Sequence, residues 1–465
     1  MTAFRERWPG AAGAIGLGCL ALVLLHLLEP AGSATWAYAH LDRHPALPWL
    51  AAASVVVLPA AAAWAWQRPW IQAPVGRFGV ARAAAVVGAA TVAVAGVGAA
   101  WPVTPICIDS WYFATAVGDG VSGNPRWYLT LWSFSELSQL ARPLVTPLAF
   151  VRLMNGVVSA WALAALAAAA RTLGRTRGEA IAIAALCWTA FGVLQLAFGY
   201  VDVYPTALCL LAVYLWLGSG VLVGNRHPVW ATVVAAIAPF FYVGLVLLAP
   251  SCLVLLWVSG RRRGWRVVAE AGGAALLAAG AATVPGYGMP FAWAALARDL
   301  APALQPGAPV DGRGALLPQS EIVSARHWIG LLHLLLLTDA VGVLLLLACG
   351  GAAVRRLPSA ESLWLAALLV PSLAYLATMD ALFGLYADWD LFSYLAAITA
   401  LAGAYAFVVW ARAAPRIAGP LLGLALAAAT VHLMARLNGL DIDFHRHLAE
   451  TPFRIPVAGA PSVAR

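Results

Sequence analysis

The residues of this sequence that could do chemistry are few, and the first of them are two carboxylates beside aromatic rings. Asp109 and Asp119 lie ten residues apart, and a Trp-Tyr-Phe run occupies positions 111–113 between them. A carboxylate held beside aromatic rings at a membrane surface is a candidate general base, and aromatic faces stack on sugar rings or acyl chains. The same residues also fit a turn at Asp119 and a helix capped by Asp109, so both interpretations stay open.

A third carboxylate, Asp202, lies in the segment Phe-Gly-Tyr-Val-Asp-Val-Tyr-Pro at 198–205, between two apolar runs. The connection is too short to carry Asp202 far into water, and a carboxylate at membrane depth costs about 2.5–3.5 kcal/mol on insertion scales. Such a residue usually pairs with another polar group or has a functional role. We therefore expect Asp202 and Tyr204 to bind substrate. Pro205 fits the first turn of a following helix, so N-capping by Asp202 is the alternative.

A short acidic motif, Asp388-Trp389-Asp390, precedes another apolar run. Two carboxylates beside an indole could bind a cation, orient a sugar hydroxyl or cap the next helix. Because the motif is expected on the same side of the membrane as Asp109, Asp119 and Asp202, we predict substrate contacts for all three of its residues.

Arginines are expected on that side as well, and a guanidinium group is suited to bidentate contact with a phosphate. Contact with anionic headgroups or with helix C-termini is the alternative for each of them. The arginines in question are Arg126, Arg142, Arg152, Arg313 and Arg326.

Two further patterns carry weaker signals. Asp339 lies near the middle of an apolar run with His333 about two turns earlier, which suits a proton or ion path. His445 and His447 form a sparse metal-ligand pattern near the C-terminus. The six cysteines include no Cys-x-x-Cys pair, so a structural zinc site or a disulfide framework is not expected.

The amino-acid composition indicates which kind of fold must hold these residues in place. Of 465 residues, 63% are hydrophobic and 10% are charged, against roughly 45–50% and about 25% in soluble domains. This excludes a soluble, disordered, collagen-like or coiled-coil chain and predicts an all-α polytopic membrane protein, because helices satisfy their own backbone groups in lipid. The net charge of +8 comes from 28 arginines without lysine and does not require a nucleic acid partner.

About 20 apolar residues are needed for each membrane span. A further apolar stretch at 228–260 is interrupted by Pro239 and Pro250 and is flanked by arginines at both ends, which predicts a hairpin of two short, broken helices. In total we expect a bundle of about 11–13 segments. The windows that qualify as single spans are 10–28, 48–66, 83–101, 143–168, 180–198, 204–223, 267–286, 328–350, 361–379, 391–411 and 417–435.

The distribution of charge predicts the orientation of the bundle. With a cytoplasmic N-terminus, 17 of the 28 arginines but only four of the 20 acidic residues fall inside. Every aspartate is then on the outer side or in the outer half of the membrane. Two outer segments, 102–142 and about 287–327, are too long for simple connections. The first is rich in aromatic residues and is expected to lie along the interface as short amphipathic helices.

The order of these features resembles the GT-C superfamily of polytopic glycosyltransferases, in particular bacterial proteins of the dolichyl-phosphate-mannose-protein mannosyltransferase type. The resemblance is carried by Gly-Asp-Gly at 118–120, by the segment 198–205 with Asp202 in place of a Glu, and by Asp-Trp-Asp-Leu-Phe at 388–392. It covers about 83–411. It therefore divides the chain into 1–82 (two helices and a linker), 83–411 (a GT-C-like core) and 412–465 (a last span and a short outer tail).

The resemblance implies a sugar on a polyprenyl phosphate as donor, and an inverting transfer to an acceptor hydroxyl of a glycan, lipid or protein on the outer face of a bacterial inner membrane. It implies an outer-loop aspartate as base. GT-C enzymes commonly place this acid early in the loop, which favours Asp109, whereas the Gly-Asp-Gly match favours Asp119. The departing phosphate needs arginine or a divalent metal, and the sequence leaves open which of the two serves. The alternative function is a polytopic transporter or flippase, for which Asp339 would be the central residue.

Overall fold

The computed structural model describes residues 8–28, 47–76, 88–89, 91–93, 108–120, 128–197, 202–283, 317, 322–379 and 392–450. Within these ranges the chain is helical, and its extended pairing is limited to one bridge between Pro74 and Thr176. In the described part of the chain, seven helices are long and apolar enough to cross a membrane, or eight if one bent pair forms a span, and three shorter helices are apolar as well. The prediction of an all-α polytopic membrane protein is therefore confirmed.

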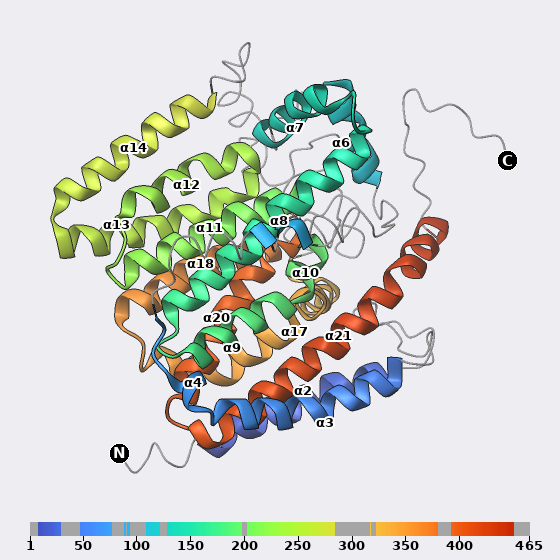
Figure 1. The fold of residues 1–465 in the computed structure, drawn as a ribbon, viewed down its shortest axis with the longest axis vertical. Helices are drawn as coiled ribbons and strands as arrows, with labels where there is room; N and C mark the ends of the chain where they lie inside the picture. The colour runs from blue at the N-terminus through green and yellow to red at the C-terminus, as the bar shows by residue number, and fades with distance from the viewer. Residues whose placement is uncertain are drawn as a thin grey trace.

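The helices lie side by side as an elongated bundle, with α6 and α7 at one end of it (Figure 1). In chain order the described elements are α2 (Trp8–Leu28), α3 (Leu47–Trp66), α4 (Pro69–Gln72), α6 (Ile108–Asp119), α7 (Tyr128–Ala141), α8 (Pro147–Leu173), α9 (Arg177–Thr189), α10 (Phe191–Ala197), α11 (Tyr204–Leu222), α12 (Pro228–Phe241), the 3-10 helix η1 (Val243–Leu248), α13 (Ala249–Arg263), α14 (Trp265–Thr283), α17 (Ala325–Val354), α18 (Ser359–Thr378), α20 (Ala396–Ala411) and α21 (Pro415–Glu450).

Local sequence signals place several helix ends. The hydroxyl of Thr146 accepts a hydrogen bond from the backbone N–H of Ala149 at the start of α8, and Pro147 follows it at the first helical position. The hydroxyl of Thr176 caps α9 in the same way by accepting from the N–H of Glu179. Such caps satisfy backbone donors that the helix itself leaves unpaired.

The centre of the bundle is α20, all of whose residues are buried. It packs along α17, while α8 packs along α11 and α3 along α21. The contact between α17 and α20 is a close approach of two backbones, because a Cβ atom added to Gly403 would overlap the carbonyl of Gly342. Small residues allow such approaches between membrane helices, which attract one another through dispersion contacts rather than through the hydrophobic effect.

We therefore expect Gly403→Ala to lower the free energy of unfolding by about 1–3 kcal/mol, the usual cost of overpacking. The matched control is Gly272→Ala in α14, where an added Cβ meets no atom within 4 Å. Because alanine favours a helix by up to about 1 kcal/mol over glycine, this control should be neutral or stabilising. Unfolding in mixed micelles would measure both changes, and equal effects of the two would contradict the close contact.

Two predicted spans are less regular than the sequence indicated. The window 180–198 was predicted as one span, but α9 and α10 meet there at an angle of 72°. The reason is tertiary: a Cβ at Gly192 would lie 2.7 Å from the carbonyl oxygen of Ser393, so α10 passes directly against the segment that leads into α20. The window 328–350 was also predicted as continuous, but α17 is broken at Asp339, whose φ and ψ are −160° and 63°.

The interrupted stretch 228–260 forms α12, η1 and α13. The end of α13 returns to the place where α12 begins, because Arg262 donates to the carbonyl of Leu222 at 2.5 Å and Arg263 to that of Gly224 at 2.6 Å. This is the hairpin that the sequence predicts. The final helix, α21, continues to Glu450, so it extends beyond the predicted span 417–435 into the region that we expected to be a tail.

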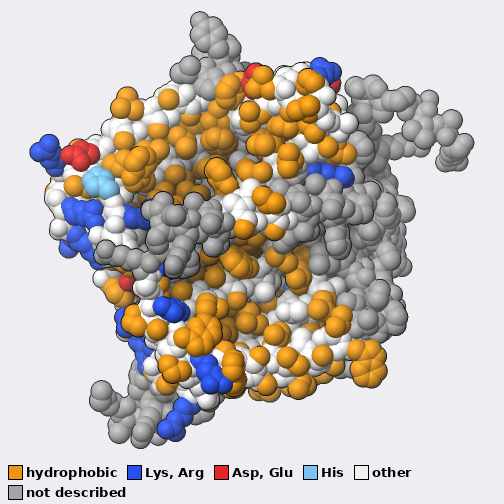
Figure 2. Space-filling model, in the orientation of Figure 1, with side chains coloured by type: hydrophobic (Ala, Val, Ile, Leu, Met, Phe, Trp, Pro, Cys, Tyr) orange, Lys and Arg blue, Asp and Glu red, His pale blue; other side chains and the backbone are white. Residues whose placement is uncertain are grey.

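The bundle has two chemically different ends. Most of the described arginines lie at the end where α8, α11, α13 and α17 finish, and this basic end occupies the left and lower left of Figure 2. Apolar side chains cover much of the remaining surface in that view. The opposite end holds α6 and α7 together with the beginnings of α8 and α11. Since α8 has 27 residues, the two ends are separated by about 40 Å.

Candidate functional site

Asp202 lies between α10 and α11, at the end of the bundle opposite the basic end, and its side chain is 2% exposed. Its Oδ1 atom accepts a hydrogen bond of 2.6 Å from the N–H of Val203. The amide of Asn155, on α8, donates to the backbone carbonyl of Asp202 at 3.0 Å. The N-cap residue of α11 is Val203, so Asp202 is one residue before the cap position that the alternative interpretation gave it.

Tyrosines from three different parts of the chain gather beside Asp202. The ring of Tyr204 is 5.5 Å from that of Tyr242, which is in turn 5.3 Å from that of Tyr394, and both contacts are edge to face. The hydroxyl of Tyr242 lies within electrostatic range of Tyr375 and Asp202. We call Tyr204, Tyr242, Tyr375 and Tyr394 the tyrosine cluster. Of its hydroxyl groups, which both donate and accept hydrogen bonds, that of Tyr242 is near enough to the buried carboxylate of Asp202 to feel its charge.

A glycine in η1 is required for this cluster. A Cβ atom on Gly244 would lie 2.5 Å from both the ring of Tyr242 and the hydroxyl of Tyr394. The hairpin of α12, η1 and α13 therefore approaches the start of α20 closely enough that only hydrogen fits at this position. The sequence analysis did not single out Tyr242, Tyr375 or Tyr394, because each belongs to an apolar run that is unremarkable by itself.

The helices α6 and α7 lie at this end of the bundle and pack against α8 and α12. Phe113 and Phe134 pack with ring centroids 5.7 Å apart, and Phe134 contacts Phe150 of α8 at 6.4 Å. The hydroxyl of Thr130 donates to the carbonyl of Phe241 at 2.8 Å, which ties α7 to the hairpin. The segment 102–142 thus contains two short helices, as expected, while their amphipathic character and their position along the interface stay predictions.

Asp119 is the last residue of α6 and is exposed. The turn predicted after it is present, because Gly120 adopts a φ of +73°. Nearby, Gln139 donates to the carbonyl of Gly118 at 3.1 Å, and Arg142 donates to Gln139 at 3.3 Å. A carboxylate at a helix C-terminus faces the negative end of the helix dipole, so Asp119 does not stabilise its own helix.

The structure does not bring Asp119 into contact with Asp202. Gly118 packs against Pro147 at the start of α8, whereas Asp202 is bonded to Asn155, eight residues further along the same helix. At 1.5 Å per residue the two carboxylates differ in depth by about 12 Å. Asp109 and Asp119 lie in the same helix, α6, and ten residues separate them by about 15 Å along its axis.

The remaining predicted site residues are placed as follows. Arg326 is exposed in the first turn of α17. The side chain of Asp109 lies outside the described residues, although its backbone is part of α6. The predicted substrate contacts Arg126, Arg313, Asp388, Trp389 and Asp390 also lie outside the described residues. The first described residue after the acidic motif, Phe392, packs on Tyr375 at 5.8 Å.

Asp339 lies at the break in α17 and accepts hydrogen bonds there through both of its carboxylate oxygens. Its Oδ1 atom accepts a hydrogen bond of 2.9 Å from the N–H of Gly342, and its Oδ2 atom accepts one of 2.7 Å from the hydroxyl of Thr399. The carboxylate therefore caps the second half of the helix. His432 approaches the carbonyl of Leu337 at 3.0 Å, so a histidine that the sequence analysis did not select lies at this break.

We expect Asp339→Ala to lower the free energy of unfolding by about 1–3 kcal/mol, because the N–H of Gly342 and the hydroxyl of Thr399 both lose their acceptor. Asp339→Asn should cost less than about 1 kcal/mol, since asparagine caps a helix as well as aspartate does. Unfolding of both variants in detergent measures the difference. Equal losses for Asn and Ala would show that the negative charge, rather than the cap, is what matters.

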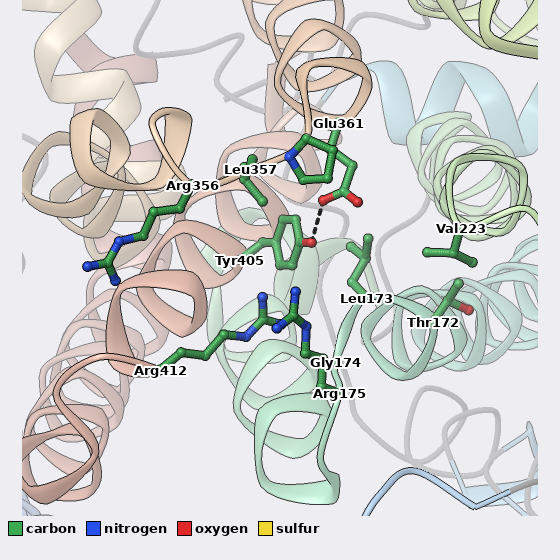
Figure 3. A pocket seen from close by; sticks show the side chains of 11 residues that line it. Thr172, Leu173, Gly174, Arg175, Val223, Arg356, Leu357, Glu361, Tyr405 and Arg412 are labelled. Carbon is green, nitrogen blue, oxygen red and sulfur yellow. Dashed lines mark hydrogen bonds between the residues drawn. The ribbon is translucent and has the colours of Figure 1, made fainter. Parts of the chain in front are cut away.

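The described residues contain a cavity of about 250 Å³ at the basic end (Figure 3). Arg175, Arg356 and Arg412 contribute to its wall, together with Tyr405 and Glu361. The hydroxyl of Tyr405 donates to Glu361 at 2.6 Å. Sequence reasoning did not select these residues. The available signal was Glu361 itself, one of the few acidic residues on the arginine-rich side.

Within the described part of the chain, no group of three or more His, Cys, Asp or Glu side chains is arranged to hold a metal ion. No family model matches the chain, and no curated protein or solved structure is significantly similar to it.

Proposed function

We propose that this protein is a membrane glycosyltransferase that moves a sugar from a polyprenyl phosphate to an acceptor hydroxyl at the end of the bundle opposite the basic end. By the positive-inside rule, this end faces outward from a bacterial inner membrane, with the N-terminus in the cytoplasm. The observation that carries the proposal is the buried carboxylate of Asp202 beside the tyrosine cluster, at the same end of the bundle as α6 and α7.

A lipid-linked sugar suits this arrangement in three respects. The prenyl tail is soluble in the lipid around the bundle, and the hairpin would help to line its groove. The sugar hydroxyls can exchange hydrogen bonds with Asp202 and the tyrosines, and aromatic rings pack on the apolar faces of sugars. The phosphate requires a cation, which Arg142 or another arginine of this end supplies, alone or with a divalent metal.

The reaction would be a displacement at the anomeric carbon. The acceptor oxygen forms a bond to that carbon while the bond to the phosphate oxygen breaks, and the phosphate leaves with the electron pair. The proton of the acceptor hydroxyl passes to an aspartate of the α6 segment, and the configuration of the sugar is inverted. Asp109 and Asp119 are the two candidates for this base, and their separation of about 15 Å means that only one of them can serve.

The test is sugar transfer by the purified protein, supplied with prenyl-phosphate sugars and a hydroxyl acceptor. We expect one of the variants Asp109→Asn and Asp119→Asn to lose roughly 10²–10⁴-fold in rate, the usual contribution of a general base, and the other to stay close to wild type. Full activity in both variants would show that the catalytic base is not an aspartate of α6. Failure to consume any prenyl-phosphate sugar would count against the donor class.

The break in α17 favours transport as the second candidate function, because transporters use discontinuous helices at the middle of the membrane to bind ions or substrates. Proton-coupled uptake into liposomes that is lost in Asp339→Asn would support transport. Asp339→Asn is informative here, because it removes a protonatable carboxylate while the side-chain oxygen can still accept the hydrogen bond from the N–H of Gly342.

A further inference from the structure

The cavity at the basic end is formed by segments that are distant in sequence. Arg175 lies in the connection between α8 and α9, Arg356 lies between α17 and α18, and Arg412 lies directly after α20. In Figure 3 the guanidinium groups of Arg175 and Arg412 point into the same space below the ring of Tyr405, while the side chain of Arg356 lies at the side and points away from them. Both Arg175 and Arg412 are close enough to Tyr405 for their charges to act on its hydroxyl.

The carboxylate of Glu179 is hydrogen-bonded to both of these arginines. Glu179 accepts hydrogen bonds from Nε and Nη2 of Arg412 at 3.0 and 2.9 Å. Its Oε2 atom also accepts from the backbone N–H of Arg175 at 2.7 Å. The carbonyl of Arg175 is held as well, by the N–H of Val75 at 3.3 Å. The backbone of Arg175 is therefore fixed on both sides, and its side chain is left to extend into the cavity.

Both carboxylates near the cavity already have partners among the described residues. That of Glu179 is paired with Arg412, and that of Glu361 accepts from Tyr405. Among the described residues the guanidinium of Arg175 has no hydrogen bond or ion pair. Burial lowers the pKa of Arg356, which indicates that part of its hydration is lost. An anion in the cavity would give the guanidinium of Arg175 a partner beside Arg412.

We propose that this cavity is a binding site for a phosphate group on the basic side of the membrane. Guanidinium forks match phosphate oxygens bidentately, and their charge does not vary at physiological pH. The volume of about 250 Å³ is below the range of roughly 300–1,000 Å³ typical of sites for drug-sized ligands, so a headgroup-sized phosphate fits better than a whole nucleotide. Leu173, Val223 and Leu357 add apolar wall for the carbon atoms next to the phosphate. The proposal is independent of the function assigned to the opposite end.

Two sources of phosphate are tested separately. The full-length protein is purified in phosphate-free buffer, and its thermal unfolding is followed while inorganic phosphate is added at constant ionic strength. In the second arm the protein is placed in nanodiscs of zwitterionic lipid with an increasing fraction of phosphatidic acid. Saturable stabilisation in either arm supports the site, because a ligand that binds only the folded state stabilises it. The responding arm identifies the source.

The decisive variant is Arg175→Gln, whose matched control is Arg355→Gln. Arg355 is exposed, adjacent to Arg356 and absent from the cavity wall, so both variants remove one exposed charge from the same end. We expect apparent phosphate affinity to fall at least tenfold in Arg175→Gln and to stay at the wild-type value in Arg355→Gln. Arg356→Gln should give a smaller loss, because this side chain stands at the side of the cavity.

The stability of each variant without phosphate is measured first, and we expect it to equal that of the wild type. The absence of a saturable response in both arms would overturn the proposal. So would equal responses of Arg175→Gln and Arg355→Gln, because the stabilisation would then come from general charge screening.

Discussion

Glu179→Gln is expected to lower the free energy of unfolding by about 2–4 kcal/mol, near the cost of breaking a buried ion pair by removing one partner. The carboxylate is 9% exposed and the Arg412 side chain 21%, so this pair is the most buried one among the described residues. The two hydrogen bonds to Arg412 join the end of α20 to the start of α9. The variant retains the size of the side chain but leaves a half-buried guanidinium without its counter-charge.

The control for this prediction is Glu270→Gln. Glu270 pairs with Arg266 at 3.3 Å, but the two side chains are 49% and 92% exposed. An exposed pair four residues apart on a helix contributes about 0.3–0.5 kcal/mol, so this variant should unfold almost as the wild type does. Unfolding in mixed detergent micelles would compare the two, and similar losses would show that burial does not strengthen the Glu179–Arg412 pair.

The loss of unfolding free energy in Glu179→Gln should not depend on pH in the neutral range. Burial acts to lower the pKa of Arg412, but the hydrogen bonds and charge of Glu179 outweigh it and raise this pKa above its usual value. A cation whose pKa is raised on folding contributes stability that is lost only when the pH rises through the folded-state pKa. Between pH 6 and 9 the guanidinium is charged in both states, so the loss on Glu179→Gln should be constant.

The helices could be predicted from the sequence because lipid imposes a local rule. Each span must satisfy its own backbone groups, so length and apolarity suffice to find it. The hairpin could be predicted for a similar reason, since arginines at both of its ends mark the side on which it enters and leaves. Asp202 could be selected because a carboxylate between two apolar runs must lie near or within the membrane, where placing it costs free energy.

The contacts that shape the sites could not be predicted in this way. Arg412 and Glu179 are 233 residues apart, and His26 and His432, which lie 2.9 Å apart, are separated by 406 residues. The bend between α9 and α10 depends on the close approach of Gly192 to Ser393, which no local pattern announces. Tyr242, Tyr375 and Tyr394 were not predicted for the same reason, because each is an ordinary member of an apolar run until the fold brings it near Tyr204, which was selected beside Asp202.

Asp202→Asn is expected to lower kcat/KM for sugar transfer roughly 10²–10³-fold, or by about 3–4 kcal/mol of transition-state stabilisation. The amide oxygen of asparagine can still accept from the N–H of Val203, so the turn before α11 should persist. What the variant removes is the negative charge beside the tyrosine hydroxyls. Its stability should therefore remain within about 1 kcal/mol of the wild type, as for other replacements that preserve a hydrogen bond.

The matched control is Asp339→Asn, the same substitution at the other aspartate that is buried among the described residues, where the carboxylate caps α17 and contacts Thr399. Under the glycosyltransferase proposal this variant should transfer sugar at nearly the wild-type rate. Asp202→Glu, which restores the charge one methylene further along, should recover part of the lost activity. If Asp202→Asn kept full activity while Asp339→Asn lost it, the reacting group would have to be sought at the break in α17. A charge at that depth is reached through the membrane rather than from its surface, so such a result would favour transport.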